Sequence, residues 1–182
     1  LKIFESVSVN GCFCGDDGDL SWAYAASGDP EFQRFTAANA ARPATMLMGR
    51  VTYEMMVSYW PTPAAAQQQP DVARGMNASE KLVLSRSLQK PAWANTRVVS
   101  GDVGRVIGDV KRGEGDDIVV LGSGDVCAQL LEAGLVDELE LVVKPIALGA
   151  GRRLFDGATA QAGLRLTHHQ TFADGNVVLR YA

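Results

Sequence analysis

The chain has 182 residues, of which 47% are hydrophobic and 21% charged, proportions that are ordinary for a globular protein with a sizeable core. Its net charge of −4 and pI of about 5.2 exclude a broad positive field for nucleic acid or an anionic membrane, so any anion site must be local. No apolar stretch reaches the ~20 residues that span a bilayer. Because no repeat or linker interrupts the chain, we expect one domain over residues 1–182.

Cysteine and histidine are rare in this sequence. The cysteines, Cys12, Cys14 and Cys127, are odd in number and form no disulfide framework. Reduced thiols, and an N-terminus without a charged segment followed by an apolar one, predict a cytoplasmic protein. No second cysteine pair or nearby histidine completes a zinc site, so no metal is expected. His168 and His169 are neighbours on a predicted strand, so their side chains face opposite sides; one is expected to be buried or at an interface and the other to face solvent.

The first 40 residues predict a strand, a loop and a helix in that order. Residues 2–8 are typical of a strand, and residues 10–19 form a loop rich in Gly and Asp. Asp29 is a candidate N-cap for a helix that begins at Pro30. Three residues of this helix fall near one face: Phe32, Phe35 and Asn39.

Strands and helices alternate through the rest of the chain. Buried strands are predicted at residues 44–48 and 117–121, further strands at residues 81–84, 96–99 and 137–145, and helices at residues 51–58, 102–112 and 125–133. Residues 61–69 are expected to form a surface loop. Pro145 places its strand at a sheet edge or bulge, and residues 164–172 and 176–181 predict an antiparallel hairpin. The pattern predicts an α/β fold with a mostly parallel central sheet and a C-terminal antiparallel hairpin.

Three predicted strands end on clusters of Gly, Ser and Arg. The clusters are Gly49 with Arg50, Ser85 with Arg86 and Ser87, and Gly122 with Ser123 and Gly124. Ligands of open α/β sheets bind beyond the carboxyl ends of the strands, where glycines and helix N-termini accept phosphates and Arg matches their oxygens. Each cluster alone is more often an ordinary turn, and Cys127 replaces the third glycine of a G-x-G-x-x-G loop. Together they predict a ligand with several phosphates, most simply a dinucleotide.

The residues at these strand ends resemble known reductases. The strand–helix junction of dihydrofolate reductases is similar to Met48–Gly49–Arg50–Val51–Thr52–Tyr53–Glu54, and their later cofactor segments resemble Val83–Leu84–Ser85–Arg86 and Gly122–Ser123–Gly124. The whole chain resembles more closely the C-terminal reductase domain of the bifunctional riboflavin-biosynthesis deaminase-reductase. The stretches that carry this likeness are Ser8–Val9–Asn10–Gly11, residues 133–139, residues 145–151 and Leu154–Phe155. The zinc motif of the deaminase half, His-x-Glu followed by Pro-Cys-x-x-Cys, does not occur in this sequence.

The resemblance implies a dihydrofolate-reductase-like three-layer fold and NADPH as the hydride donor. The implied contacts of the adenosine-side phosphates are Gly49, Arg50 and Thr52, and those of the 2′-phosphate are Ser85, Arg86 and Ser87. The implied pyrophosphate loop consists of Gly122, Ser123, Gly124 and Asp125, and the nicotinamide would lie beside the loop that contains Val9 and Gly11. An arginine flanked by hydroxyl donors suits the 2′-phosphate of NADPH, whereas a site for NAD is expected to carry an acidic residue that binds the ribose.

Fewer residues indicate the substrate side. Glu31 resembles the carboxylate on the first helix with which dihydrofolate reductases hold the pterin, so it is the candidate catalytic residue; an apolar cleft would raise its pKa. The alternative, of equal weight, is that Glu31 only stabilises the N-terminus of its helix electrostatically. Trp22 either lines the cleft or packs in the core. Arg152 and Arg153 either bind a substrate phosphate or are solvated at the surface.

These features predict an NADPH-dependent oxidoreductase that acts on a small heterocyclic molecule. By resemblance the leading substrate is 5-amino-6-(5-phosphoribosylamino)uracil, an intermediate of riboflavin biosynthesis. Dihydrofolate or another pterin is the alternative substrate, and a protein that binds NADPH without catalysis is the alternative from another class. A homodimer is expected because the edge strand with Pro145 and the C-terminal hairpin need covering.

Overall fold

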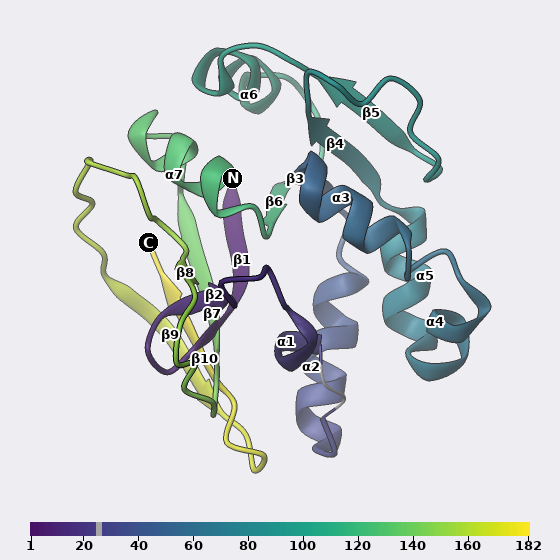
Figure 1. Cartoon of the computed structure of the whole chain (residues 1–182), viewed down its shortest axis with the longest axis vertical. Coiled ribbons are helices and arrows are strands. Elements are labelled where there is room, and N and C mark those ends of the chain that lie inside the picture. The colour runs from purple at the N-terminus through teal and green to yellow at the C-terminus, as the bar shows by residue number, and fades with distance from the viewer. Residues whose placement is uncertain (25–26) are drawn as a thin grey trace.

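An eight-stranded sheet forms the middle layer of the structure, a computed structural model that describes residues 1–24 and 27–182 (Figure 1). The strand order is β5-β4-β3-β6-β1-β7-β10-β9, and the first six of these are parallel to one another. Their bounds are β1 Lys2–Ser8, β3 Thr45–Gly49, β4 Glu80–Leu84, β5 Thr96–Val99, β6 Ile118–Leu121, β7 Glu138–Lys144, β9 Leu166–Thr171 and β10 Val177–Tyr181. Since β10 and β9 are antiparallel, the predicted mostly parallel sheet with a C-terminal hairpin is confirmed.

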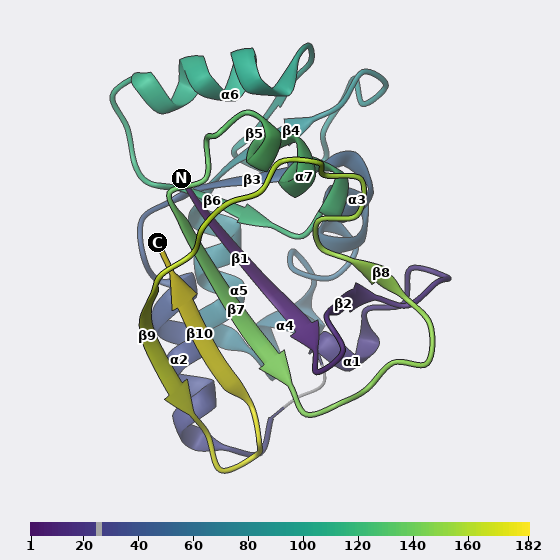
Figure 2. The same ribbon diagram turned by 90° about the vertical axis from the view of Figure 1, so that its left-hand side faces the viewer.

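Helices cover both faces of this sheet. Their bounds are α1 Ser21–Tyr24, α2 Pro30–Ala40, α3 Arg50–Val57, α4 Pro63–Gln68, α5 Pro70–Ala78, α6 Val103–Arg112 and α7 Gly124–Glu132. One face carries α6 and α7, and the other carries α2, α3, α4 and α5 (Figures 1 and 2). Within residues 1–24 and 27–182, no helix has the length and apolar character that crossing a membrane requires.

The strands alternate their side chains between the two helical layers. On β1, Ile3 and Val7 belong to the core under α6 and α7, whereas Phe4 packs with the aromatic cluster of α2. On β3, Leu47 faces the first of these cores, and Met46 and Met48 pack against α3 and α5. Because alternate residues point to opposite faces, both layers are anchored in the same central strands.

Local signals explain why α2 and α6 begin where predicted. Asp29 has extended backbone geometry and accepts hydrogen bonds from the N–H groups of Glu31 and Phe32, while Pro30 opens α2. Asp102 caps α6 through the N–H of Arg105 at 2.8 Å. These caps satisfy donors that would otherwise lack partners at the helix N-termini.

The predictions for three segments were wrong. Residues 61–69 do not form a loop but include α4, capped by Thr62, and α5 follows at once. The expected loop at 10–19 contains strand β2 (Cys12–Cys14), which pairs with the unpredicted strand β8 (Arg152–Arg153) in a second, two-stranded sheet. Pro145 lies just after β7, which is an interior strand of the sheet. The edge strand on this side of the sheet is β9, the outer strand of the C-terminal hairpin. The homodimer stays a prediction.

Candidate functional site

The three predicted ligand segments lie next to one another at the carboxyl edge of the sheet. In the register of β3 and β4, Gly49 is opposite Leu84, so the segment that begins at Ser85 follows directly beside it. On the other side of β3, strand β6 ends at Leu121, immediately before Gly122. Parallel strands end at the same edge, and the structure therefore brings these three segments to one site.

Ser123 joins two of these segments. Its Oγ accepts a hydrogen bond from the N–H of Gly49 at 2.8 Å and lies 2.7 Å from the Oγ1 of Thr52. Gly49 has no room for a side chain, because an added Cβ would meet Ser123 Oγ at 2.8 Å. Gly122 and Ser123 have φ angles of +60° and +67°, the left-handed geometry of a sharp turn into α7.

The turn at Gly122 and Ser123 presents the N-terminus of α7. No side chain caps this helix, and the first N–H groups of a helix have no partner within it. Asp125 is exposed in the first turn, and its Oδ1 is 2.8 Å from an Nη atom of Arg152. Uncapped N–H groups at a glycine turn are the usual protein ligands of a phosphate, so this turn suits a pyrophosphate.

Both arginines of the neighbouring segments are exposed. Arg50 forms an ion pair with Glu54, at 2.6 Å, one turn along α3. Arg86 has no ion-pair partner among the described residues. The turn that presents it is held by Ser85, whose Oγ accepts from the N–H groups of Ser87 and Leu88 at 3.1 and 2.9 Å. This leaves the Arg86 guanidinium available for an anion.

The loop after β1 lies at the same edge. Val9 is 61% exposed, and its N–H donates to the carbonyl of Ile146 at 2.9 Å. The side chain of Asn10 exchanges two hydrogen bonds with the backbone of Leu148. Gly11 has a φ of +82°. The loop is therefore fixed against the segment that follows β7 and presents an exposed apolar side chain.

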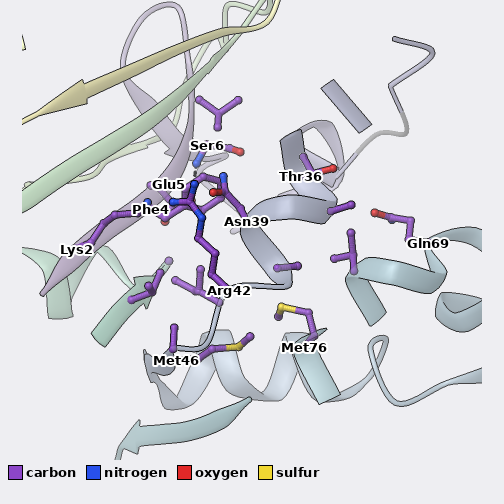
Figure 3. Close-up of a pocket in the computed structure, with 18 of the residues that line it drawn as sticks. Lys2, Phe4, Glu5, Ser6, Thr36, Asn39, Arg42, Met46, Gln69 and Met76 are labelled. Atoms are coloured by element: carbon purple, nitrogen blue, oxygen red, sulfur yellow. Dashed lines mark hydrogen bonds between the residues drawn. The ribbon is translucent and has the colours of Figure 1, made fainter. Parts of the chain in front are cut away.

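A groove of about 860 Å³ runs between α2, α5 and the sheet (Figure 3). Its labelled lining residues are Lys2, Phe4, Glu5, Ser6, Thr36, Asn39, Arg42, Met46, Gln69 and Met76. The groove also reaches Gly122 and Lys144 at the carboxyl edge. A mostly apolar groove with a few polar groups, adjoining the predicted phosphate segments, is the form expected of a small-molecule site.

Lys144 is the buried cation of this groove, and the sequence analysis missed it. The side chain comes from the last residue of β7, and its Nζ lies 4.6 Å from the centroid of the Phe32 ring. Burial lowers the pKa of Lys144, and the charge of Asp174 opposes that shift. An ammonium group on an aromatic face within the groove is suited to hold a carbonyl or anionic oxygen of a ligand.

A buried ion network supports the floor of the groove. Glu140 of β7 is fully buried and accepts hydrogen bonds from Lys2 at 2.9 Å, from Arg180 at 2.6 Å and from Asn39 at 3.2 Å. Burial alone would raise the pKa of Glu140, but the hydrogen bonds and charges of Lys2 and Arg180 outweigh it and lower this pKa. Since Lys2 and Arg180 are paired here, the groove's exposed cation is Arg42.

Glu31 does not lie in an apolar cleft, so the role expected for it is not supported. The side chain is exposed, does not line the groove and accepts a hydrogen bond from Gln170 of β9 at 2.9 Å. The neighbouring Phe32 is the residue of this helical turn that points inward. Successive residues of a helix are about 100° apart, and Glu31 is therefore turned to the surface.

The other expected substrate residues also lie outside the groove. Trp22 is half-buried in α1, and its Nε1 is buried without a hydrogen-bond partner among the described residues. Arg152 and Arg153 are exposed on β8; Arg152 lies over the Phe13 ring at 5.7 Å and pairs with Asp125. Neither arginine lines the groove, so the alternative of solvated surface residues fits their positions better than contact with a substrate phosphate in the groove.

The structure adds one acidic residue that the sequence analysis did not single out. Glu5, in the middle of β1, is 9% exposed, and its Oε1 accepts from the N–H of Ser6 at 3.0 Å. Its Oε2 is buried and has no hydrogen-bond partner among the described residues. Burial raises the pKa of Glu5 to about 8, against the lowering effect of the backbone N–H groups of Ser6 and Gly122.

Histidine and cysteine contribute no metal centre to the part of the chain that is described. Within it, no group of three or more His, Cys, Asp or Glu side chains is arranged to hold a metal ion. His168 and His169 are both exposed on the edge strand β9, so neither is buried within the chain, and the alternative that one of them lies at an interface stays a prediction. Cys12, Cys14 and Cys127 are buried free thiols.

Comparison with known proteins agrees with this architecture. Residues 1–178 match the RibD C-terminal domain family. The uncharacterized protein YyaP of Bacillus subtilis is 24% identical over 176 residues, which cover 97% of this chain and 90% of YyaP.

Two solved structures share the fold. A Shewanella sp. PV-4 protein assigned by its name to riboflavin biosynthesis has a TM-score of 0.77 at 20% identity, covering 99% of this chain and 96% of its own. A Thermotoga maritima diaminohydroxyphosphoribosylaminopyrimidine deaminase/5-amino-6-(5-phosphoribosylamino)uracil reductase has a TM-score of 0.66 at 12% identity, and the match covers 99% of this chain and 55% of that one. The fold is dihydrofolate-reductase-like, as the resemblance implied. With a family match that spans nearly its whole length, the chain belongs to the RibD C-terminal domain family.

Proposed function

We propose that this protein is an NADPH-dependent reductase of a phosphorylated pyrimidine or a closely related heterocycle. The observation that carries the proposal is the meeting of three ligand segments at one sheet edge, where Ser123 bonds both Gly49 and Thr52. The groove between α2 and the sheet opens at that same edge, at Gly122 and Lys144. A cofactor on the edge and a substrate in the groove would therefore meet at the carboxyl end of β1.

The residues present fit NADPH. The uncapped N-terminus of α7, behind the turn at Gly122 and Ser123, is suited to the pyrophosphate. Arg86, exposed and flanked by Ser85 and Ser87, supplies charge and hydroxyl groups for a 2′-phosphate. When bound, NADPH supplies a hydride to a C=N or carbonyl carbon. The chain's own part is to orient the two molecules and to exclude water from the groove.

The groove supports a substrate that combines a flat heterocycle with a distant anionic group. Phe32 and Lys144 lie at the carboxyl edge, where an aromatic face and an ammonium group suit a ring with exocyclic oxygens. Arg42 gives the groove an exposed cation that takes the place expected for Arg152 and Arg153. The Thermotoga protein is named as reducing a pyrimidine that carries a ribosyl phosphate, which matches both requirements.

We predict that Arg86→Ala weakens NADPH binding by about 1–3 kcal/mol, roughly 5- to 150-fold in Kd, and leaves NADH binding nearly unchanged. The reason is that only NADPH carries the 2′-phosphate. Isothermal titration of both cofactors with wild type and variant measures the effect. Arg74→Ala is the matched control, since Arg74 is an exposed arginine of α5 that pairs with Asp71, remote from the strand ends. Equal losses for both cofactors would contradict the role of Arg86.

Turnover separates the candidate substrates. We expect the protein to oxidise NADPH in the presence of 5-amino-6-(5-phosphoribosylamino)uracil and not of dihydrofolate, because the helix carboxylate expected to hold a pterin, Glu31, lies outside the groove. The rate at which the absorbance of NADPH decreases at saturating substrate measures this turnover. Oxidation with dihydrofolate alone would establish a pterin reductase. Tight NADPH binding without oxidation by any heterocycle would indicate a binding protein that lacks catalysis.

A further inference from the structure

We infer that Glu5 is a positioning residue beneath the Gly122–Ser123 turn. When the turn binds the phosphates of a dinucleotide, the Glu5 carboxyl group is protonated, so that binding is coupled to the uptake of one proton. This inference deepens the proposed function, because it concerns the same cofactor site. It assigns a role to a buried acid that the reductase geometry described above does not use.

The sheet opens at the position of Glu5. Strand β1 pairs with β6 only from Lys2↔Val119 to Phe4↔Leu121, whereas it pairs with β7 as far as Ser8↔Lys144. Glu5 is therefore the first residue of β1 that has lost β6 as a neighbour. Across the opening, Gly122 is the first residue after β6. The opening is thus bounded by Glu5 on one side and by the predicted phosphate turn on the other.

The carboxyl group of Glu5 lies against that turn. A Cβ built on Gly122 would meet Glu5 Oε2 at 3.6 Å and the side-chain atoms of Thr52 at 3.2 and 3.3 Å. Glu5 Oε1 is held by the N–H of Ser6, which faces the opening in the absence of a β6 partner. The second oxygen, Oε2, is buried and directed at the turn; it accepts no hydrogen bond among the described residues, although the nearby N–H of Gly122 lowers the pKa of Glu5. A satisfied structural acid would have partners on both oxygens.

Charge determines what this arrangement does. The titratable groups around Glu5 are the thiols of Cys14 on β2 and Cys127 on α7, and the pKa values of both are raised by burial and by Glu5. The nearby cation, Arg152, lowers the pKa of Cys14 and forms an ion pair with Asp125. No described cation pairs with Glu5 itself. Its ionised form would therefore place an uncompensated negative charge directly below a bound pyrophosphate.

Proton uptake on cofactor binding follows from this placement. Burial already raises the pKa of Glu5 to about 8, and a bound polyanion would raise it further. Below this pKa the acid is neutral and the turn accepts phosphates without repulsion. Above it, binding must draw a proton from solution, so affinity falls by up to about tenfold for each further pH unit.

The experiment is titration of the full chain with NADPH between pH 7 and 9.5, in buffers of different ionisation enthalpy that reveal proton uptake. This range keeps the 2′-phosphate dianionic, and NADH serves as the control that lacks it. Wild type is expected to take up a proton near pH 8 and to lose up to about thirtyfold in affinity for NADPH by pH 9.5. Glu5→Gln, which keeps the shape and the acceptor for Ser6, is expected to lose both the proton uptake and the pH dependence, so that its affinity for NADPH is nearly the same at pH 7 and at pH 9.5.

Proton uptake that persists unchanged in Glu5→Gln, or pH-independent binding by wild type, would overturn the inference and leave the proposed function intact. Inorganic pyrophosphate is the second probe. Binding of pyrophosphate with Glu5-linked proton uptake, but no binding of NADPH, would support the inference and refute the cofactor. Binding of neither probe by a folded protein would overturn both. Thermal unfolding of Glu5→Gln verifies that the variant is folded, and Glu5→Asp, a shorter acid at the same position, should restore the pH dependence.

Discussion

Phe32→Ala is expected to lower the free energy of unfolding by about 3–5 kcal/mol, the usual cost of removing a large buried aromatic ring. Phe32 is only 6% exposed. Its ring centroid lies 5.1 Å from that of Phe172 in an edge-on arrangement and 6.0 Å from that of Phe35. The ring also covers the Nζ of Lys144. The substitution therefore removes a large part of the packing of α2 on the sheet and uncovers a buried cation.

Urea unfolding followed by circular dichroism measures this loss. Phe32→Leu is the matched control, because it keeps most of the apolar volume and is expected to lose much less. Val51→Ala is a second control, since Val51 is 71% exposed and its truncation is expected to leave stability nearly unchanged. A Phe32→Ala variant as stable as the Val51→Ala variant would contradict the packing described for α2.

Elements with strong local signals could be predicted from the sequence. The α2 helix carries its own start signal in Asp29 and Pro30, and α6 shows apolar residues at helical spacing behind the cap Asp102. Strands β1 and β5 have the predicted bounds. In each case the residues that determine the structure are neighbours in the chain, so one sequence suffices to recognise them.

The α4 and α5 helices could not be predicted because their stability comes from distant contacts. Their sequence is rich in Ala and Gln and shows no long apolar stripe. The structure buries Ala65, Ala73 and Met76 against Trp60 and the α3 layer. Gly75 passes so close to α2 that an added Cβ would lie 2.0 Å from the carbonyl oxygen of Ala40. Only the assembled fold shows that these small residues are needed for close helix packing.

The candidate site was predictable in its strand ends and not in its buried charges. The strand ends carry visible Gly, Ser and Arg clusters, and parallel topology brings them together. Glu5 and Lys144, in contrast, look like the polar residues of ordinary alternating strands. Whether such a residue is buried depends on what packs over it, such as α7 or Phe32, and these partners are far away in the sequence.

Glu140→Ala is expected to lower the free energy of unfolding by about 3–5 kcal/mol, because it leaves Lys2 and Arg180 without their shared buried acceptor. The two cations are 17% and 25% exposed, so water does not readily replace the carboxylate. Asp71→Ala is the control: it breaks the Asp71–Arg74 pair, in which both side chains are more than 60% exposed, and is expected to leave stability nearly unchanged.

The contribution of Glu140 to the free energy of unfolding should also decrease as the pH is lowered. Its pKa is lowered in the folded protein, so its stabilising effect is fully present above the ordinary value of 4.5 and is lost as pH falls through the folded pKa. The neutral variant Glu140→Gln does not titrate at this position. The stability difference between wild type and Glu140→Gln, measured by urea unfolding at pH 7 and at decreasing pH below 4.5, should therefore shrink. A difference that stays constant or grows on acidification would show that the carboxylate is not stabilised by Lys2 and Arg180.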